Sequence, residues 1–431
     1  MLDSSAACRS VILLCLVPLV ALSAAAETPT PEIAPAINSL GLDLYREQIK
    51  SADGSGVLLS PYSIATALAM TYAGADGVTK AEMKKVLHLP ADQAESEAAF
   101  QSLAAQLAKV VSDSEQQVAQ MRRHDGDATP IQLNVANRLF VQRGYSLRSA
   151  FVDELHRYFG SDLAELDFQH DAGQARQIIN QWVARQTQDK IRDLLPVDTP
   201  TTDTRLALVN ALYLRANWAD EFQESDTQPE LFHFIGKVAT TVPTMHSHRG
   251  YGYAKRDGYS VVAVPYLGNE LQLVLIVPDK EDGLAALEKS LNVKALSDCA
   301  HLKHREVIFH LPKFKLEPET MPLAQALQAL GLRTTFDQPR SSANFDRMAP
   351  RRPNDYLYIG AVYHKTWISV DEHGTEAAAA TSVLMLRSFG VMAPSKEPPP
   401  VEVRADRPFM FAIQHVQSGA CLFLGRVTDP R

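Results

Sequence analysis

The chain has 431 residues, of which 46% are hydrophobic and 21% charged, an ordinary globular composition that supplies ample core. Its formal net charge of −8 at pH 7 argues against a protein that binds nucleic acid or anionic membrane surfaces. Short basic groups such as Lys80 with Lys84 and Lys85 are interpreted as solvated faces rather than as a polyanion site. Length alone allows one large domain or several ordinary ones.

The first residues have the pattern of an export signal. Arg9 precedes an apolar run over residues 11–22, and a small-residue cleavage site ends at Ala26. This run is too short to cross a bilayer, and no later stretch is apolar for long enough, so we expect no membrane span. We predict a signal peptide over residues 1–26, a linker over residues 27–37, and a secreted protein. Its destination is extracellular, or periplasmic if the source is bacterial.

Cysteine usage indicates that stability comes from packing. The exported chain would keep Cys299 and Cys421, which can form one bridge at most, and whether they pair is left open. Cys421 lies in an apolar run and is predicted to be a small core residue. There is no Asn-x-Ser/Thr sequon, so N-glycosylation is not expected.

Helical patterns dominate the first half of the chain. Asn38 is the expected cap of the first helix, and Pro61 lies in the first turn of the second. Expected strands in this half span residues 57–59, 133–141 and 206–214. The expected helices cover residues 38–50, a segment beginning at Ser60, and residues 79–87, 100–120, 147–159 and 172–187.

The pattern changes to short β segments from Phe232 onward, with one more helix at residues 323–330. No Pro/Gly/Ser-rich linker and no internal repeat divides the chain. We therefore predict one α+β domain over residues 38–431, with helices segregated from large mixed sheets. The expected strands cover residues 261–266, 271–277, 307–314, 356–363, 367–370, 409–413 and 421–427.

One segment does not fit the pattern around it. Residues 374–381 are rich in alanine and would be helical by propensity. They nevertheless follow a strand directly, and the irregular stretch behind them ends in three prolines at 398–400. A connection of about thirty residues is long for a compact domain, and such loops are usually functional or disordered.

Motifs for common enzyme chemistry are absent. The sequence contains no HExxH, Walker, GxGxxG or GxSxG motif, and nothing in it points to a Ser-His-Asp triad. The pairs His301/His304 and His246/His248 have loose metal-like spacing, but neither pair has a clear carboxylate partner. We interpret them as surface histidines on loops, and we expect no enzyme activity, no cofactor and no metal.

The stretch Val370–Thr381, which reads VDEHGTEAAAAT, resembles the hinge of the serpin family. Further motifs of that family follow in the same order along the chain, so the resemblance covers about residues 38–430. It implies three β-sheets, eight or nine helices and an exposed reactive-centre loop at about residues 372–400. These motifs are Asn137–Phe140, Val209–Tyr213 with Trp218, Leu311–Phe314, and Asp406–Phe409 with Phe423–Pro430.

The resemblance implies a monomeric suicide inhibitor of serine proteases, with papain-like cysteine proteases as a second target class. In that family the protease forms an acyl-enzyme with the loop, and the cut loop then inserts into the main sheet. The alternative is a non-inhibitory member that acts as a ligand carrier or chaperone. Such members tend to carry bulky, charged or proline residues in the hinge, whereas this chain carries alanines.

The hinge residues make insertion physically reasonable. Alternate side chains of a strand point to opposite faces, so Thr375, Ala377 and Ala379 share one face. After Glu376 no charge, proline or bulky group occurs before Val383, so insertion buries no charge. About ten new hydrogen bonds, each worth ~0.5–1.5 kcal/mol, would make the native form a kinetic trap. The hinge comprises Glu372, Gly374, Thr375, Glu376, Ala377, Ala378, Ala379, Ala380 and Thr381.

Two further groups follow from the resemblance. A shutter beneath the centre of the sheet would govern strand separation, and a breach at the top would be where the loop first inserts. An ion pair between Lys313 and Glu372 is expected in the breach. The shutter residues are Ser60, Ser63, Asn210 and His364, and the breach residues are Trp218, Lys313 and Glu372.

The bait bond has two candidates. Counting from Gly374 by the commonest loop length of the family places it between Ser388 and Phe389, which would suit elastase-, subtilisin- or papain-like enzymes. A loop shorter by one residue places it between Arg387 and Ser388. Arginine presents a cationic fork that an acidic specificity pocket binds strongly, so we favour Arg387–Ser388 and trypsin-like targets.

Overall fold

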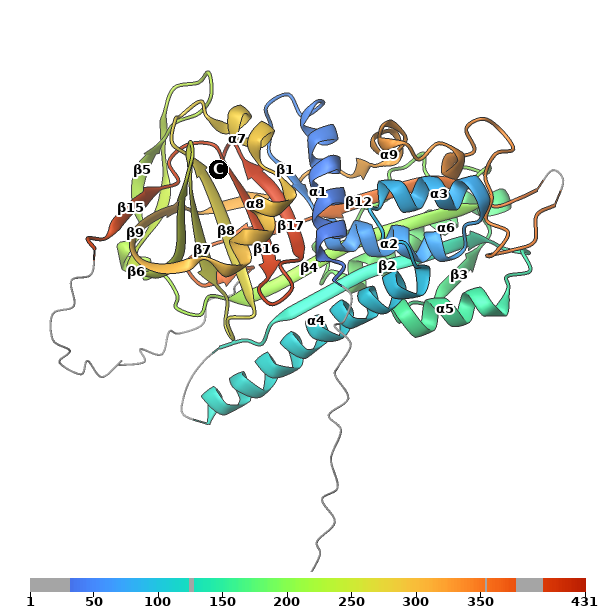
Figure 1. Cartoon of the computed structure of the whole chain (residues 1–431), viewed down its shortest axis with the longest axis horizontal. Coiled ribbons are helices and arrows are strands. Elements are labelled where there is room, and N and C mark those ends of the chain that lie inside the picture. Colours follow the sequence, from blue (N-terminus) through green and yellow to red (C-terminus); the bar gives the residue numbers. More distant parts are fainter. Residues whose placement is uncertain (1–31, 124–127, 353–354, 377–397) are drawn as a thin grey trace, which may run out of the picture. The chain divides into compact units, whose positions relative to one another are not determined.

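The computed structural model describes residues 32–123, 128–352, 355–376 and 398–431. These residues form nine α-helices and seventeen strands, as the α+β prediction requires (Figure 1). None of the helices within the described ranges combines the length and the apolar content needed to cross a bilayer. The helices are α1 Ala34–Ile49, α2 Pro61–Ala73, α3 Gly77–Val86, α4 Gln93–Arg122, α5 Ser149–Phe159, α6 Phe168–Gln186, α7 Leu284–Ser290, α8 Val293–Ser297 and α9 Ala324–Leu330.

Helix boundaries follow local capping chemistry. Ser60 caps α2, since its Oγ accepts a hydrogen bond from the Ser63 N–H at 3.2 Å and Pro61 occupies the first turn. Asp92 caps α4 by accepting from the Glu95 N–H, so this helix begins at Gln93, well before the predicted residue 100. The first turns of α4 are rich in polar residues, so the apolar pattern in the sequence did not reveal where the helix begins.

The prediction that Asn38 caps the first helix is wrong. α1 begins at Ala34, inside the predicted linker, with Pro35 in its first turn and no side-chain cap. Asn38 is instead fully buried, and its Nδ2 donates to Ser297 Oγ at 3.1 Å and to the Gly419 carbonyl at 2.9 Å. Its Oδ1 accepts from the Cys421 N–H at 2.9 Å. Asn38 therefore ties α1 to segments far along the chain.

Among the described residues, the two cysteines Cys299 and Cys421 are both buried and free. Burial raises the pKa of the Cys299 thiol to about 12. Cys421 is a core residue, as predicted.

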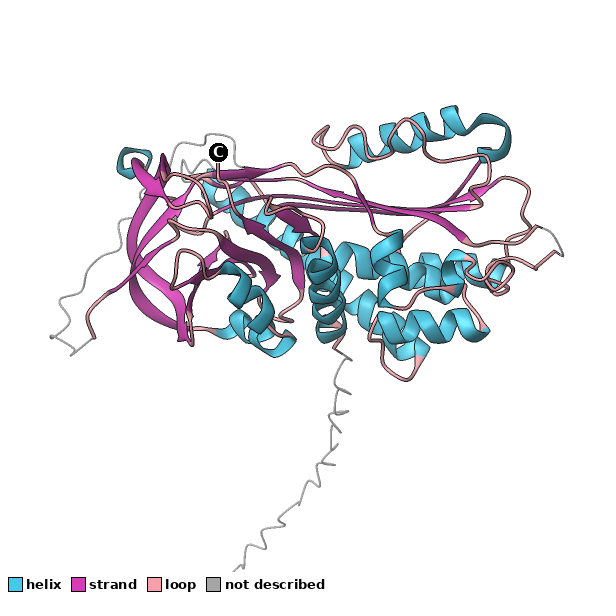
Figure 2. Cartoon of the chain, turned by 90° about the horizontal axis from the view of Figure 1, so that it is seen from above, coloured by secondary structure: helices cyan, strands magenta, loops and turns pink. Residues whose placement is uncertain are grey.

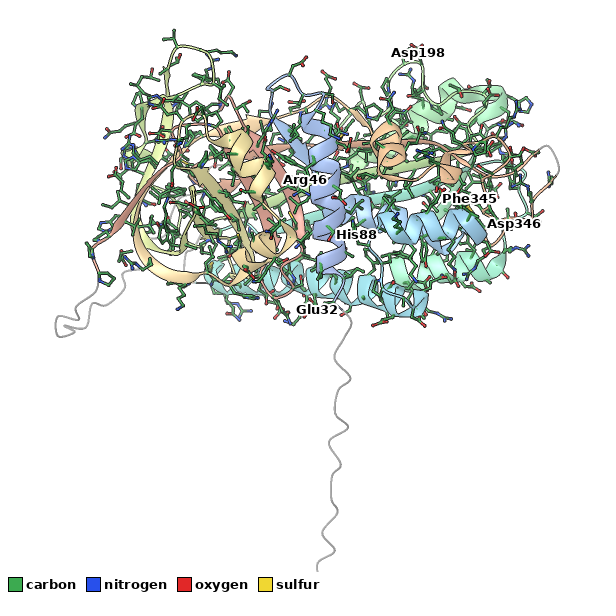
Figure 3. All side chains as sticks on the ribbon, turned by 45° about the horizontal axis from the view of Figure 1, so that its top comes forward. Glu32, Arg46, His88, Asp198, Phe345 and Asp346 are labelled. Carbon is green, nitrogen blue, oxygen red and sulfur yellow. The ribbon has the colours of Figure 1, made fainter. Side chains whose placement is uncertain are left out.

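On the surface, Figure 3 labels Arg46 of α1 and His88, which follows α3. Both contact Asp43, with His88 Nε2 2.8 Å from its carboxylate, so a small polar network joins these two helices.

The first sheet has eight strands and is built around β4 (Leu206–Asn217). β2 (Gln132–Gln142) lies antiparallel on one side of β4, and β12 (Ile359–Thr366) lies parallel on the other. We call this the main sheet. Its other strands are β3 Leu163–Leu166, β10 Phe314–Leu316, β11 Met321–Pro322, β13 Ile368–Val370 and β14 Gly374–Thr375.

Helices cover both faces of the main sheet, as Figure 2 shows for the long strands. On β4 the side chains alternate: Leu206, Leu208 and Leu212 enter the larger core, with α2 on that face. Ala207, Val209 and Ala211 join a second core on the face of α6. Because both faces are buried, β4 is a nearly continuous apolar run, which explains why it stands out in the sequence.

The second sheet has nine strands, and its longest, β6, spans Thr240–Arg256. The prediction of only short β segments after Phe232 is wrong here, because residues 245–250 read Met-His-Ser-His-Arg-Gly and show no apolar alternation. The other strands are β1 Val57–Leu59, β5 Gln228–Phe232, β7 Tyr259–Pro265, β8 Leu271–Pro278, β9 Lys303–Pro312, β15 Val401–Arg404, β16 Phe409–His415 and β17 Cys421–Val427.

Strand β6 pairs with β5, β7 and β9, and so joins the strands of this sheet into one network. Of the three expected sheets, two are therefore continuous through β6. The same strand corrects the interpretation of the histidine pairs as loop residues. His246 and His248 lie within β6, His304 lies in β9, and His301 ends a short 3₁₀ turn.

Candidate functional site

The site begins at the point where β4 extends beyond its parallel neighbour β12. The pairing of β4 with β12 ends at Leu212 and Thr366, but β4 continues to Asn217. There β14 takes the place beside β4, with Gly374 opposite Asn217 and Thr375 opposite Ala216. On its other side β14 pairs with β13. The first hinge residues thus already lie in the main sheet, at one end of the β4–β12 boundary.

Gly374 permits this close approach. A Cβ at this position would lie 2.1 Å from the Ala216 carbonyl oxygen and 2.8 Å from the Asn217 Cα. Its φ of +154° also lies in a region that side-chain-bearing residues rarely adopt. Glycine is therefore required for the hinge to pair with β4.

The next two residues face opposite sides of the sheet. Thr375 is buried toward the larger core, and its Oγ1 is hydrogen bonded to the hydroxyl of Tyr266. Glu376 lies on the other side, with its carboxylate 2.8 Å from Lys190 Nζ and its N–H bonded to the Ser369 carbonyl. Its φ of +48° turns the chain out of strand geometry. Within the described residues, the pairing of β14 with β4 ends at Thr375.

The rest of the predicted loop lies outside the described residues. This holds for the hinge residues Ala377–Thr381 and for both candidate bonds, Arg387–Ser388 and Ser388–Phe389. Their roles stay predictions.

The three breach residues come together around the start of the hinge. Lys313 Nζ lies 2.7 Å from Glu372 Oε2, so the expected ion pair is present, and Thr227 Oγ1 donates to Glu372 Oε1 at 2.7 Å. Burial would raise the pKa of Glu372, but these two partners hold it below its ordinary value. Trp218 is buried, and its Nε1 donates to the Asp371 carbonyl at 2.9 Å.

His373 makes contacts near the breach that sequence reasoning missed. Its Nδ1 lies 3.0 Å from Glu221 and its Nε2 3.1 Å from Glu224, while the Trp218 N–H donates to its carbonyl. Burial opposes the charge, but the two carboxylates raise the pKa of His373. No local pattern could have revealed this cluster, because both acidic residues stand far earlier in the chain.

The four shutter residues also meet, and they meet on the β4–β12 boundary. His364 of β12 stands directly opposite Asn210 of β4, and its Nδ1 is hydrogen bonded to Asn210 Oδ1. On the other ring nitrogen, Nε2 is 3.0 Å from the Ser60 backbone N–H. Because that N–H can only donate, Nε2 is the acceptor and Nδ1 carries the proton.

Asn137 is the shutter member that sequence reasoning did not assign. It pairs with Asn210 across β2 and β4, and its Oδ1 accepts from Asn210 Nδ2 at 3.0 Å and from Ser63 Oγ at 2.8 Å. The residue was noted only as part of a strand motif. No local signal singles it out, because β2 also carries the polar residues Asn134 and Arg138.

Full burial of this network lowers the pKa of His364 to about 3, so the imidazole is neutral. The His364–Asn210 bond spans the boundary that an inserted strand would have to open. The shutter contacts thus cross the β4–β12 boundary, and the breach contacts surround the start of the hinge.

These features define a class of protein in which a loop begins inside its own sheet, next to two parallel strands that could separate. The family model described as "Serpin (serine protease inhibitor)" matches residues 35–430. The chain therefore belongs to the serpin family.

Among curated proteins, the chain is 34% identical to the leukocyte elastase inhibitor of Homo sapiens, with 93% of this chain and 100% of that protein covered. It is 35% identical to an uncharacterised serpin-like protein of Thermococcus kodakarensis, with 92% and 85% covered. Among solved structures, Serpin48, a highly specific serpin of the insect Tenebrio molitor, matches with a TM-score of 0.77 and 28% identity, covering 93% and 98%. The predicted family and fold are thereby confirmed.

Proposed function

We propose that this protein is a secreted suicide-substrate inhibitor of serine endopeptidases. The observation that carries the proposal is the hinge, whose first strand pair lies beside β4 at the end of the β4–β12 boundary. The residues that follow, Ala377–Ala380 and Thr381, are small and uncharged. A strand built from them can extend β14 along β4 without burying a charge.

The trapping step is a competition between two rates. The protease serine attacks the bait carbonyl carbon, an ester forms, and the amine of the next residue leaves as a new N-terminus. Water would then hydrolyse the ester. Insertion must come first: it replaces one ladder between β4 and β12 with two ladders to the new strand. The gain of about ten hydrogen bonds, each worth ~0.5–1.5 kcal/mol, drives it.

We propose trypsin-like targets, with Arg387–Ser388 as the bait bond, because arginine gives an acidic pocket a strong ligand. The name of the human relative, leukocyte elastase inhibitor, supports the alternative bond Ser388–Phe389 and an elastase-like target. Both bonds serve the same trapping chemistry. They differ in which protease is trapped.

Mixing the purified protein with trypsin tests the proposal. We expect a higher-mass band that survives SDS, and a released peptide whose first residue, read by mass spectrometry, is Ser388. A fragment beginning at Phe389 would move the bait bond one residue downstream. Rapid cleavage without an SDS-stable band by trypsin-, elastase- and subtilisin-like enzymes would overturn inhibition. N-terminal sequencing of the exported protein tests secretion, with Glu27 expected as the first residue.

A further inference from the structure

The strand register places two histidines side by side on neighbouring strands of the second sheet. His246 of β6 stands directly opposite His310 of β9, and Arg404 of β15 is the next residue in the same row. Directly opposite residues bring their side chains within about 5 Å on one face. The two imidazole ring centres are accordingly 4.5 Å apart.

Glu230 of β5 brings a carboxylate to this pair. Its Oε1 lies 3.1 Å from His246 Nε2 and 3.2 Å from His310 Nδ1. The three ligand atoms all lie within 4.8 Å of one another, and all three side chains are partly buried, with 12–26% of their surface exposed. Two nitrogens and one oxygen thus converge from three different strands.

We propose that Glu230, His246 and His310 form a zinc-binding site. Zinc takes imidazole nitrogens and carboxylate oxygens at ~2.0–2.2 Å in tetrahedral geometry, which puts neighbouring ligand atoms roughly 3.3–3.6 Å apart. The two nitrogen–oxygen distances, 3.1 and 3.2 Å, need to change by only a few tenths of an ångström to match. A water molecule would complete the tetrahedron. Two imidazoles favour zinc over calcium or magnesium, which prefer oxygen ligands.

The state of the nitrogens supports a metal at this point. His246 Nε2 is buried, yet within the described part of the chain it has no hydrogen-bond partner, since the nearby Glu230 oxygen is poorly aligned for one. His310 Nδ1 faces the same carboxylate, 3.2 Å from Glu230 Oε1. The cluster therefore contains a buried nitrogen whose missing partner a metal ion would supply.

The surroundings both support and limit the site. Glu402 Oε1 lies 3.5 Å from His310 Nε2, where it can orient the ring from its far nitrogen. Arg404 Nη2 bonds Glu230 Oε2 at 2.7 Å, which leaves Oε1 toward the imidazoles but places a cation beside the metal. Asp406, 3.5 Å from Arg404 Nε, offsets part of that charge. Removing the guanidinium should therefore strengthen zinc binding.

His248 provides a matched control. It lies two residues from His246 on the same strand, but its Nε2 is 3.7 Å from Glu306 and the side chain is 58% exposed. The metal-like pair visible in the sequence, His246 with His248, is thus replaced in the structure by His246 with His310. Cross-strand pairing, which the linear spacing does not reveal, makes the difference.

Titration of Zn²⁺ alone into the full-length protein at pH 7.5, followed by calorimetry, tests the site. We expect one zinc ion per chain. His246→Gln, His310→Gln and Glu230→Gln should each weaken binding at least about tenfold, since loss of even an outer-shell partner typically costs about that much. His248→Gln should leave it unchanged, and Arg404→Met should tighten it.

Absence of stoichiometric zinc binding in the parent protein would overturn the proposal. Equal affinity in the parent and in all three ligand variants would overturn it as well, as would loss of binding in His248→Gln alone. Thermal midpoints of each variant establish that the fold is intact. If a ligand variant unfolds, Arg404→Met decides, since only a metal bound at Glu230 gains affinity when that cation is removed.

Discussion

At the scale of single residues, His364 makes the shutter sensitive to pH. Its pKa falls from an ordinary 6.5 to about 3 because the ring is buried, and its Nε2 is already occupied by the Ser60 N–H. The unfolded chain binds this proton near pH 6.5 and the folded chain does not. Stability is therefore full above pH 6.5 and is lost as the pH falls toward 3.

Between pH 6.5 and pH 5 this single proton should remove about 2 kcal/mol of stability. Denaturant midpoints measured at both pH values test the prediction, and His364→Gln should show a shallower dependence on pH than the parent. The other histidines contribute equally to the pH dependence of stability in the parent and in His364→Gln, so the difference between the two slopes reports His364 alone. Equal slopes would show that His364 does not carry the effect.

We propose that Arg387 decides target specificity. Arg387→Ala should abolish trypsin inhibition, because alanine offers nothing to an acidic pocket. Inhibition of elastase- or subtilisin-like enzymes through Ser388–Phe389 should remain. Arg340→Ala, which removes an exposed arginine from another loop, is the control and should inhibit trypsin normally. Persistent trypsin complexes in Arg387→Ala would move the bait bond away from Arg387.

Residue by residue, the sequence indicated the site through motifs rather than through contacts. Ser60, Ser63, Asn210 and His364 were predicted as a group and do meet, as do Lys313 and Glu372. Asn137 and His373 could not be assigned in advance. Their partners come from other strands, and only the register brings them within bonding distance.

At the scale of elements, the hinge strand shows which side chains must be buried. Thr375 faces the larger core and Glu376 faces Lys190, so strand alternation directs Ala377 inward. Ala377→Arg would place an unpaired cation in that core and slow insertion. We expect a variant that is cleaved at the same bond but forms little SDS-stable complex.

Glu397→Arg is the matched control for Ala377→Arg, since it adds the same cation to the loop beyond the inserting stretch. Its stoichiometry of inhibition, measured by titrating protease activity, should stay near that of the parent. The account of the hinge fails if Ala377→Arg inhibits with the parent's stoichiometry.

Elements with a strong apolar pattern were predictable, and those without one were not. β4 and β17 were recognised because both are almost wholly buried. β6 was not, because its middle is polar and its stability comes from pairing with three other strands. The early start of α1 depends on tertiary contacts, and no cap marks it in the sequence.

At the scale of the whole molecule, the described structure keeps β4 and β12 paired, and β14 pairs with β4 only over Gly374 and Thr375. A native state of this kind is held by a barrier rather than by its depth. In the proposed mechanism, the His364–Asn210 bond must break and Glu376 must leave Lys190 before the strands separate. The left-handed φ of Glu376 holds about 1–3 kcal/mol of strain, which extension into a strand would release. Cleavage frees the loop to cross that barrier.

The melting temperature before and after loop cleavage tests this central claim most directly. Insertion worth ~10 kcal/mol should raise the thermal midpoint by tens of degrees, since each kcal/mol shifts a large domain by a few degrees. Ala377→Arg, cleaved at the same bond, should gain much less. Equal midpoints for intact and cleaved parent protein would contradict the account, because the cleaved form would then be no more stable than the intact form.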